Sequence, residues 1–205
     1  MFDRIRQDYQ TYRSARHRGF WAIVFYRYGR WVAAMRPGPI RWALNGIYST
    51  LSIIAPVITG VSLDRNTEIG SALHIIHPGM VLIHPRARIG HRVGLMHGIT
   101  LGTSPTHPGM PTIGDDVFIG CGAVVLGAVT IGDGARIAPN SLVITDVAPG
   151  ATAIGVPAKV YPATTAGRAP AKSVASAGPI ANANLAKPAE GGQPTDAGSA
   201  DVNLT

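Results

Sequence analysis

A six-residue repeat runs through the middle of the chain and restricts what it can fold into. One aliphatic residue recurs every six positions, in two long runs. The first run comprises Leu63, Ile69, Ile75, Ile83, Ile89, Leu95 and Leu101, and the second comprises Ile113, Ile119, Val125, Ile131, Ile137 and Val143. Six residues make one short strand and a turn, and three such units close one triangular coil. We therefore predict a mainly β fold, a parallel β-helix whose aliphatic side chains stack inside.

Two interruptions break this period. Ile75 and Ile83 are eight residues apart, so two extra residues lie around His77. Leu101 and Ile113 are twelve residues apart, which leaves room for a loop at TSPTHPGMP. Repeat proteins carry such insertions on the face that binds or reacts. The two interruptions are therefore the first places to look for a functional site.

Assigning three units to each coil predicts which residues share an edge. With the loop on the first side of the third coil, the residue two after each third unit is His77, His97, Cys121 and Pro139. These residues should stack roughly 4.8 Å apart, so an extended ligand can lie along them. His77 lies at the insertion and is the candidate catalytic residue. His97 is a candidate ligand-lining residue.

The remaining histidines divide by their position. His107 lies in the loop and is a candidate substrate contact. His74, His84 and His91 fall near turns, where we expect them to face solvent. No histidine spacing matches a zinc site, and Cys121 is the only cysteine. We therefore expect neither a metal nor an internal disulfide.

The segments on either side of the repeat differ from it in composition. Residues 1–60 predict a helical cap, because aromatic and aliphatic residues recur at helical spacing in GFWAIVFYRYGRWVAAM and a second helix is expected at about 40–54. Residues 61–161 carry the β-helix. Residues 162–205 are rich in Ala, Pro, Gly and Ser, and predict a disordered tail.

The helical region has two interpretations. The formal net charge is +7, and basic residues concentrate between Arg4 and Arg41 without a nucleic-acid-binding motif, so nucleic acid is not an expected partner. The region is either a cap that packs on the main domain or a partner subunit, or a basic, aromatic surface that contacts a membrane. Residues 42–63 are uncharged and long enough to span a bilayer, although Asn45 and Pro56 favour a buried or membrane-surface helix. The polar N-terminus is unlike a signal peptide, so we expect a cytoplasmic location; of the two interpretations, the packed cap is favoured and peripheral membrane contact is the alternative.

Several sequence blocks resemble bacterial serine acetyltransferases in content and in order. They are IGSALHIIH at 69–77, ITLGT at 99–103, IGCGAVVLG at 119–127 and GVPAK at 155–159. The resemblance covers about residues 61–160 and implies a left-handed parallel β-helix, acetyl-CoA as co-substrate and acetyl transfer to a hydroxyl group. The family's helical region joins two trimers and is much shorter here, so a single homotrimer is expected.

The resemblance also implies roles for individual residues. The family's general base matches His77, and its neutral imidazole suits removal of a hydroxyl proton. Arg136 is a candidate contact for the nucleotide phosphates. Positions that line coenzyme A in the family fall on Gly102, Thr103, Cys121, Arg136 and Pro139.

Two departures from the family concern the acceptor. The acidic partner of the base falls on Ser62, and Asp64 is the candidate replacement. The Arg-His pair that grips the serine carboxylate falls on Gly109 and Met110, and the loop contains no Arg or Lys. Two acceptors therefore stay open, L-serine and the sugar hydroxyl of a glycan such as an exopolysaccharide. A third hypothesis is a non-catalytic hexapeptide scaffold that does not turn over acetyl-CoA.

Overall fold

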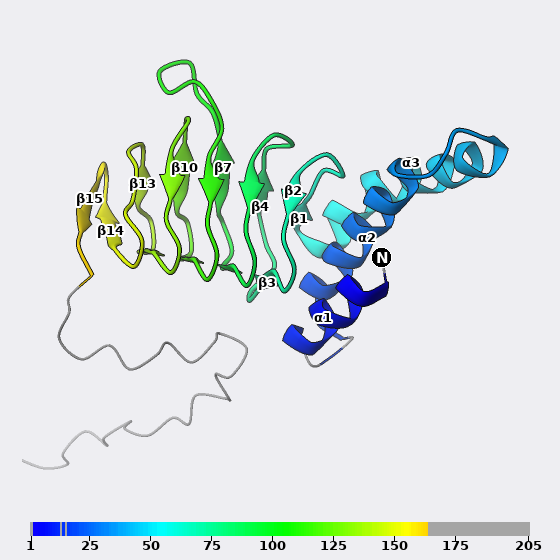
Figure 1. The fold of residues 1–205 in the computed structure, drawn as a ribbon, viewed down its shortest axis with the longest axis horizontal. Coiled ribbons are helices and arrows are strands. Elements are labelled where there is room, and N and C mark those ends of the chain that lie inside the picture. Colours follow the sequence, from blue (N-terminus) through cyan, green and yellow to red (C-terminus); the bar gives the residue numbers. More distant parts are fainter. Residues whose placement is uncertain (1, 13, 15, 164–205) are drawn as a thin grey trace, which may run out of the picture.

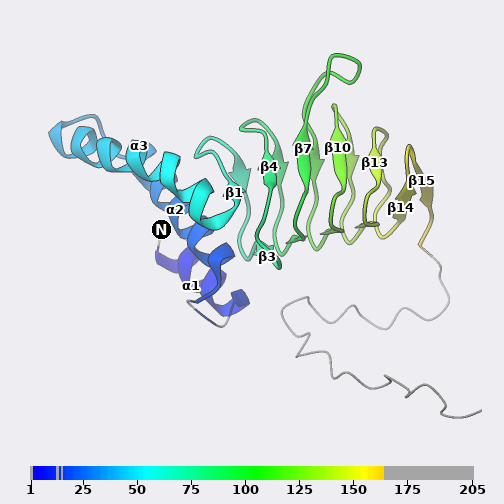
Figure 2. The same ribbon diagram turned by 180° about the vertical axis from the view of Figure 1, so that it is seen from behind.

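The computed structural model describes residues 2–12, 14 and 16–163. Three helices come first, α1 (Phe2–Tyr12), α2 (Arg18–Ala33) and α3 (Pro39–Thr59). Figure 1 shows them packed at one end of a column of stacked coils, and Figure 2 shows the same arrangement from behind. The predicted tail at 162–205 lies outside the described residues, apart from 162 and 163.

The strands form three sheets, which are the three faces of the column. Face A contains β1 (Val61–Ser62), β4 (Val81–Ile83), β7 (Thr100–Gly102), β10 (Val124–Leu126) and β13 (Leu142–Val143). Face B contains β2 (Glu68–Ile69), β5 (Arg88–Ile89), β8 (Thr112–Ile113) and β11 (Thr130–Ile131). Face C contains β3 (His74–Ile75), β6 (Gly94–Leu95), β9 (Phe118–Ile119), β12 (Arg136–Ile137), β14 (Thr152–Gly155) and β15 (Ala158–Tyr161). Neighbouring strands are parallel except β14 and β15, which form an antiparallel pair.

Strand pairing confirms the predicted repeat register. Ile89 pairs with Ile113 on face B, and Leu95 pairs with Ile119 on face C. The loop falls between β7 and β8, on the first side of the third coil, as predicted. The stacked aliphatic side chains are buried and form one continuous core. The hexapeptide period therefore predicted both the fold class and the register.

Glycine at one corner of the coils allows their backbones to approach closely. A Cβ atom on Gly70 would lie 2.5 Å from the carbonyl oxygen of Gly90 in the next coil. No side chain fits at that distance, which explains why glycine follows the aliphatic residue in successive repeats.

The helices close the open edge of the first coil. That coil has no neighbour on its N-terminal side, so its backbone groups need other partners. The Ile75 N–H donates to the Tyr12 hydroxyl at 2.7 Å, and the Ala72 N–H donates to the Asp8 carboxylate at 2.9 Å. Both acceptors come from α1. The first helix thus replaces the missing coil by side-chain hydrogen bonds.

Arg27 of α2 completes this cap. Its Nε donates to the Asp8 carboxylate at 3.0 Å, and its Nη1 donates to the Ile69 carbonyl at 3.0 Å. The side chains of both charged residues are buried, with 4% exposure for Arg27 and 0% for Asp8. Buried charges are tolerated when they are paired and hydrogen-bonded, as these are. The helical region therefore packs on the β-helix through specific polar contacts.

The helix α3 differs from the expected second helix. It runs from Pro39 to Thr59, beyond the predicted end at about 54, because Pro56 is accommodated within it. Its inner side packs on α2, where the Tyr48 ring leaves no room for a side chain at Gly29. Its outer side is exposed, so it is not the buried helix that was one of the expectations. By length and composition alone, this helix could also cross a membrane.

Candidate active site

The two extra residues near His77 change the backbone ladder at that point. The strands β3 and β6 are paired in register, but the next hydrogen bond joins the Gly98 N–H to the Gly79 carbonyl at 2.8 Å. Gly79 therefore stands beside His97 in the ladder. The prediction that His77 heads a regular stack was wrong in this respect, because the insertion lifts His77 out of register. Its side chain is exposed at the corner between faces C and A.

Beyond His97 the predicted column is regular. The carbonyl groups of His97 and Cys121 accept N–H groups from the next coil, at 3.0 and 2.8 Å. His97, Cys121 and Pro139 therefore occupy equivalent places in three successive coils. The His77 ring joins this column from the side, with its centroid 6.3 Å from that of His97. We call the group of His77, His97, Cys121 and Pro139 the histidine corner.

His74 lies under the helical cap, next to this corner. Its ring meets the Tyr12 ring edge-on, with centroids 5.1 Å apart, and its Nδ1 is buried without a hydrogen-bond partner. The expectation that His74 faces solvent was wrong, because α1 covers this part of face C. Burial lowers the pKa of His74 below its usual 6.5, and the nearby His17 and His77 lower it further. A neutral ring at His74 is therefore favoured beside His77.

Gly102 and Thr103, which were predicted to line coenzyme A, lie at the other edge of face A. Gly102 ends β7 and is buried, whereas Thr103 is exposed and its hydroxyl donates to the His107 carbonyl at 3.2 Å. The loop then folds back on itself, with two backbone hydrogen bonds of 3.1 Å between Ser104 and His107. His107 lies against Gly127 of the next coil. The structure therefore brings Gly102, Thr103 and His107 together, apart from the histidine corner.

Asp64, the candidate acidic partner of His77, lies on this same edge of face A. Ser62, on which the family's acidic partner falls, lies on face A itself. The Asp64 carboxylate accepts the Asn66 N–H at 2.7 Å, in the turn between β1 and β2. Ser62 points outward from face A. Face A separates the Asp64 turn from the corner that holds His77. One chain therefore does not bring Asp64 and His77 together.

Arg136 flanks the histidine corner on face C. It is exposed, and its guanidinium carbon lies 5.8 Å from the centroid of the Phe118 ring. Arg136 precedes Pro139 by three residues, so its positive charge lies beside the column. Within residues 2–12, 14 and 16–163, no three His, Cys, Asp or Glu side chains gather in a way that could hold a metal ion.

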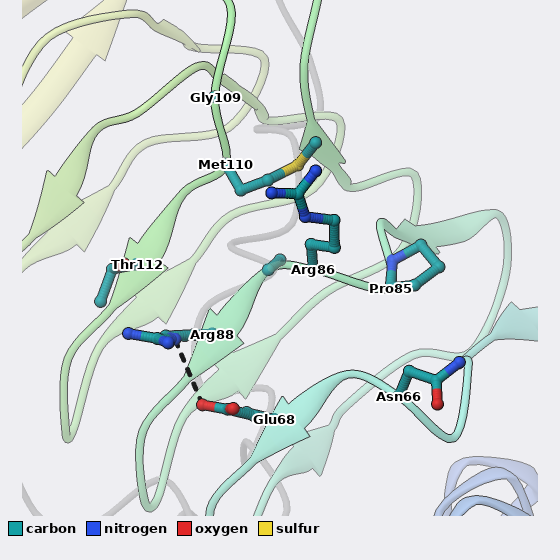
Figure 3. A pocket seen from close by; sticks show the side chains of 9 residues that line it. Asn66, Glu68, Pro85, Arg86, Arg88, Gly109, Met110 and Thr112 are labelled. Carbon is teal, nitrogen blue, oxygen red and sulfur yellow. Dashed lines mark ion pairs between the residues drawn. The ribbon is translucent and has the colours of Figure 1, made fainter.

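A pocket on face B contains a cation that the sequence analysis missed. It lies below the loop and is lined by Arg86, Arg88, Gly109 and Met110, among others. Figure 3 shows the Arg86 side chain reaching toward Met110, whereas Arg88 pairs with Glu68 at 3.2 Å. In the described part of the chain, no carboxylate lies within ion-pair distance of Arg86. Arg86 belongs to an earlier repeat than the loop, so only the coil stacking reveals that they are neighbours.

Comparison with known proteins identifies the family. Residues 110–145 match the family described as bacterial transferase hexapeptide (six repeats). The serine acetyltransferase of Helicobacter pylori strain J99 is 41% identical over 115 residues, which cover 55% of this chain and 67% of that protein. The chain belongs to the serine acetyltransferase family. It is therefore an O-acetyltransferase, and the expected enzyme class is confirmed.

Solved serine acetyltransferases share the fold as well. The soybean serine acetyltransferase apoenzyme is 27% identical, with a TM-score of 0.67, and the match covers 78% of this chain and 68% of that one. A serine acetyltransferase from Brucella abortus strain S19, solved in complex with coenzyme A, is 27% identical with a TM-score of 0.63. That match covers 72% of this chain and 57% of the other.

Proposed function

We propose that this chain transfers the acetyl group of acetyl-CoA to the hydroxyl group of L-serine, with His77 as the general base. The observation that carries the proposal is the histidine corner. An exposed imidazole stands at the insertion, next to a regular column of residues from three further coils. The chain's family membership supplies the reaction class, and the corner supplies a group that can accept the hydroxyl proton.

The proposed chemistry needs one proton acceptor and one oxyanion site. The neutral imidazole of His77 removes the hydroxyl proton as the oxygen attacks the thioester carbonyl carbon. The tetrahedral intermediate carries a negative charge on the former carbonyl oxygen, which preorganised N–H donors stabilise. The C–S bond then breaks, and the imidazolium returns its proton to the leaving thiolate. Because the neutral state of His74 is favoured, His74 places no positive charge beside His77 during this cycle.

Acetyl-CoA is proposed to lie along the histidine corner. The column of His97, Cys121 and Pro139 extends through three coils and suits an extended molecule. Arg136 beside it carries a planar cation for the phosphates. The serine acetyltransferase of Brucella abortus was solved with coenzyme A, which supports the same co-substrate here.

A homotrimer is proposed, because face A is an uncovered apolar surface. Its outward residues include Leu82, Val124 and Leu142, and Leu82 is 51% exposed. The outward residues of face B, by contrast, include Glu68 and Arg88. Three copies that bury face A around a three-fold axis place the histidine corner of each copy against the loop edge of the next. Gly102, Thr103, Asp64 and His107 would then approach His77 from a neighbouring chain.

The unpaired Arg86 supports serine as the acceptor. An amino-acid acceptor needs a cation for its carboxylate, and the loop residues Gly109 and Met110 provide none. Arg86 points toward Met110 in the same pocket and has the fork geometry that binds a carboxylate in two places. The neutral loop itself favours the second candidate, a sugar hydroxyl, which has no carboxylate to bind.

Release of free coenzyme A from acetyl-CoA tests the general base. We expect serine-dependent release by the wild type and a loss of about 10²–10⁴-fold in kcat for His77→Ala. His91→Ala is the matched control, since His91 is also exposed but lies at a different corner. Equal rates in wild type and His77→Ala would exclude His77 as the base. No release with any acceptor would favour the non-catalytic scaffold.

Arg86→Ala distinguishes the two acceptors. If serine is the acceptor, its KM should rise by about 10–100-fold, because a charge-assisted hydrogen-bond pair is lost. Arg92→Ala is the control, because Arg92 is exposed but pairs with Asp116 away from the pocket. Turnover with a glycan acceptor, no turnover with serine and no effect of Arg86→Ala would assign the enzyme to polysaccharide modification.

A further inference from the structure

The outer side of α3 is an exposed apolar surface. Its residues include Ile40, Trp42, Ile47, Ile53, Val57 and Ile58. Trp42 is 82% exposed and Val57 is 81% exposed. No charged residue occurs between Arg41 and Asp64 in the sequence, and the exposed Thr50 donates its hydroxyl back to the Gly46 carbonyl at 3.2 Å, so this side of the helix carries no charge. A contiguous apolar surface of this kind indicates a partner.

Exposed aromatic residues also occur on α2, next to α3. All three tryptophans of the chain, Trp21, Trp31 and Trp42, lie in the helical region, and all are exposed. Trp31 contacts Tyr28, whose hydroxyl donates to the Leu44 carbonyl of α3 at 3.1 Å. Tryptophan is enriched where a protein meets the boundary between lipid and water, because its ring is apolar and its N–H is polar.

The charge around this surface discriminates between its possible partners. Residues 1–42 contain nine Arg and two Asp, so they account for the whole net charge of +7. Of the two, Asp8 is buried against Arg27, and residues 9–63 contain no Asp or Glu. Two copies that met through this region would bring cations against cations. An anionic lipid surface attracts them instead.

We propose that α3 docks in the plane of a membrane surface that contains anionic lipids. The apolar side enters the interface, while Arg36 and Arg41 at the N-terminal end of α3 contact lipid phosphates. The helix lies on the membrane rather than crossing it, because its C-terminal end is fixed to the protein. Gly60 alone separates α3 from β1, and the Arg18 Nε donates to the Ile58 carbonyl at 2.8 Å.

This proposal is independent of the acyl acceptor, since it uses no residue of the histidine corner or the loop. In the proposed trimer, three-fold symmetry places all three copies of α3 at the same end of the molecule. Docking would then be multivalent, which strengthens the attachment without new contacts. The enzyme would work at a membrane surface while its β-helix remains in water.

Vesicle co-sedimentation of the full chain tests the proposal. Vesicles of phosphatidylcholine with about one third phosphatidylglycerol are compared with pure phosphatidylcholine, at low and high salt. We expect binding to the anionic vesicles that weakens with salt. Val57→Glu should reduce that binding about tenfold or more, since it places a charge in the apolar interface. Trp42→Ser is a second variant at the other end of α3.

Val156→Glu is the matched control, because Val156 is 70% exposed and lies at the opposite end of the β-helix. It should bind vesicles like the wild type. Circular dichroism verifies that each variant is folded. Absence of wild-type binding to anionic vesicles, or equal binding by Val57→Glu, overturns the proposal. So does association of the wild type into larger oligomers that Val57→Glu abolishes without any vesicle binding, which would assign the surface to a second copy.

Discussion

At the scale of single residues, His77 shows how an insertion in a repeat protein exposes a side chain at a coil corner. In a regular coil, the position after the corner is held by hydrogen bonds on both sides. The two extra residues before Ile83 move this role to Gly79 and leave His77 projecting beside His97. The sequence located this insertion, because the period breaks there. It did not predict the side-by-side geometry, because spacing alone does not say which residues of an insertion leave the ladder.

His74 gives a pH prediction at the same scale. Burial lowers its pKa in the folded protein, so the unfolded chain binds more protons just below pH 6.5. Folding stability should therefore be fully present above about pH 6.5 and fall as the pH drops below it. In His74→Phe, which keeps an aromatic ring against Tyr12, the decrease in Tm between pH 7.5 and 5.5 should be smaller. His91→Phe should retain the wild-type decrease, and a wild-type decrease in His74→Phe would contradict the assignment.

At the scale of elements, the sequence predicted the contacts of the strands better than the contacts of the helices. Each strand of the repeat needs only one aliphatic residue in register, so the hexapeptide period predicted the parallel pairings from β1 to β13, but not those of β14 and β15. The contacts of the helical cap have no such pattern. Backbone groups of the first coil form hydrogen bonds with Asp8, Tyr12 and Arg27. Every residue has such backbone groups, so no sequence pattern in the first coil identifies these contacts. The cap was predicted, but the polar side chains that attach it were not.

Arg27→Met tests how much the cap stabilises the protein. The substitution leaves the Asp8 carboxylate buried without its cation, which should lower the free energy of unfolding by roughly 3–5 kcal/mol. Arg30→Met is the control, because Arg30 lies on the same helix but is exposed. Urea unfolding followed by circular dichroism measures both. The double variant with Asp8→Asn should recover part of the loss, and a change below about 1 kcal/mol in Arg27→Met would show that the pair does not hold the cap.

At the scale of the whole molecule, the candidate site is divided between two edges of face A. The histidine corner lies along one edge, and the loop, Asp64 and Arg86 lie along the other. The sequence pattern named His77, Asp64 and the loop but missed Arg86, and one chain cannot bring the two edges together. The uncharged outward side of face A, with Leu82 half exposed, explains how they meet if three copies bury it. The residues that complete the site are then supplied by another copy of the same chain.

Mixing two defective chains tests this division. His77→Ala damages the histidine corner, and Arg86→Ala damages the loop edge, so each homotrimer should show little serine-dependent release of coenzyme A at low serine. When the two chains are co-expressed in equal amounts, about a quarter of the interfaces in a cyclic trimer pair an intact His77 with an intact Arg86. We therefore expect about a quarter of the wild-type activity in the mixture, measured after purification through different tags on the two chains. Mixing the two purified homotrimers without subunit exchange is the control and should give no recovery. If the co-expressed trimer is no more active than its parents, both residues act within one chain and the shared site is excluded.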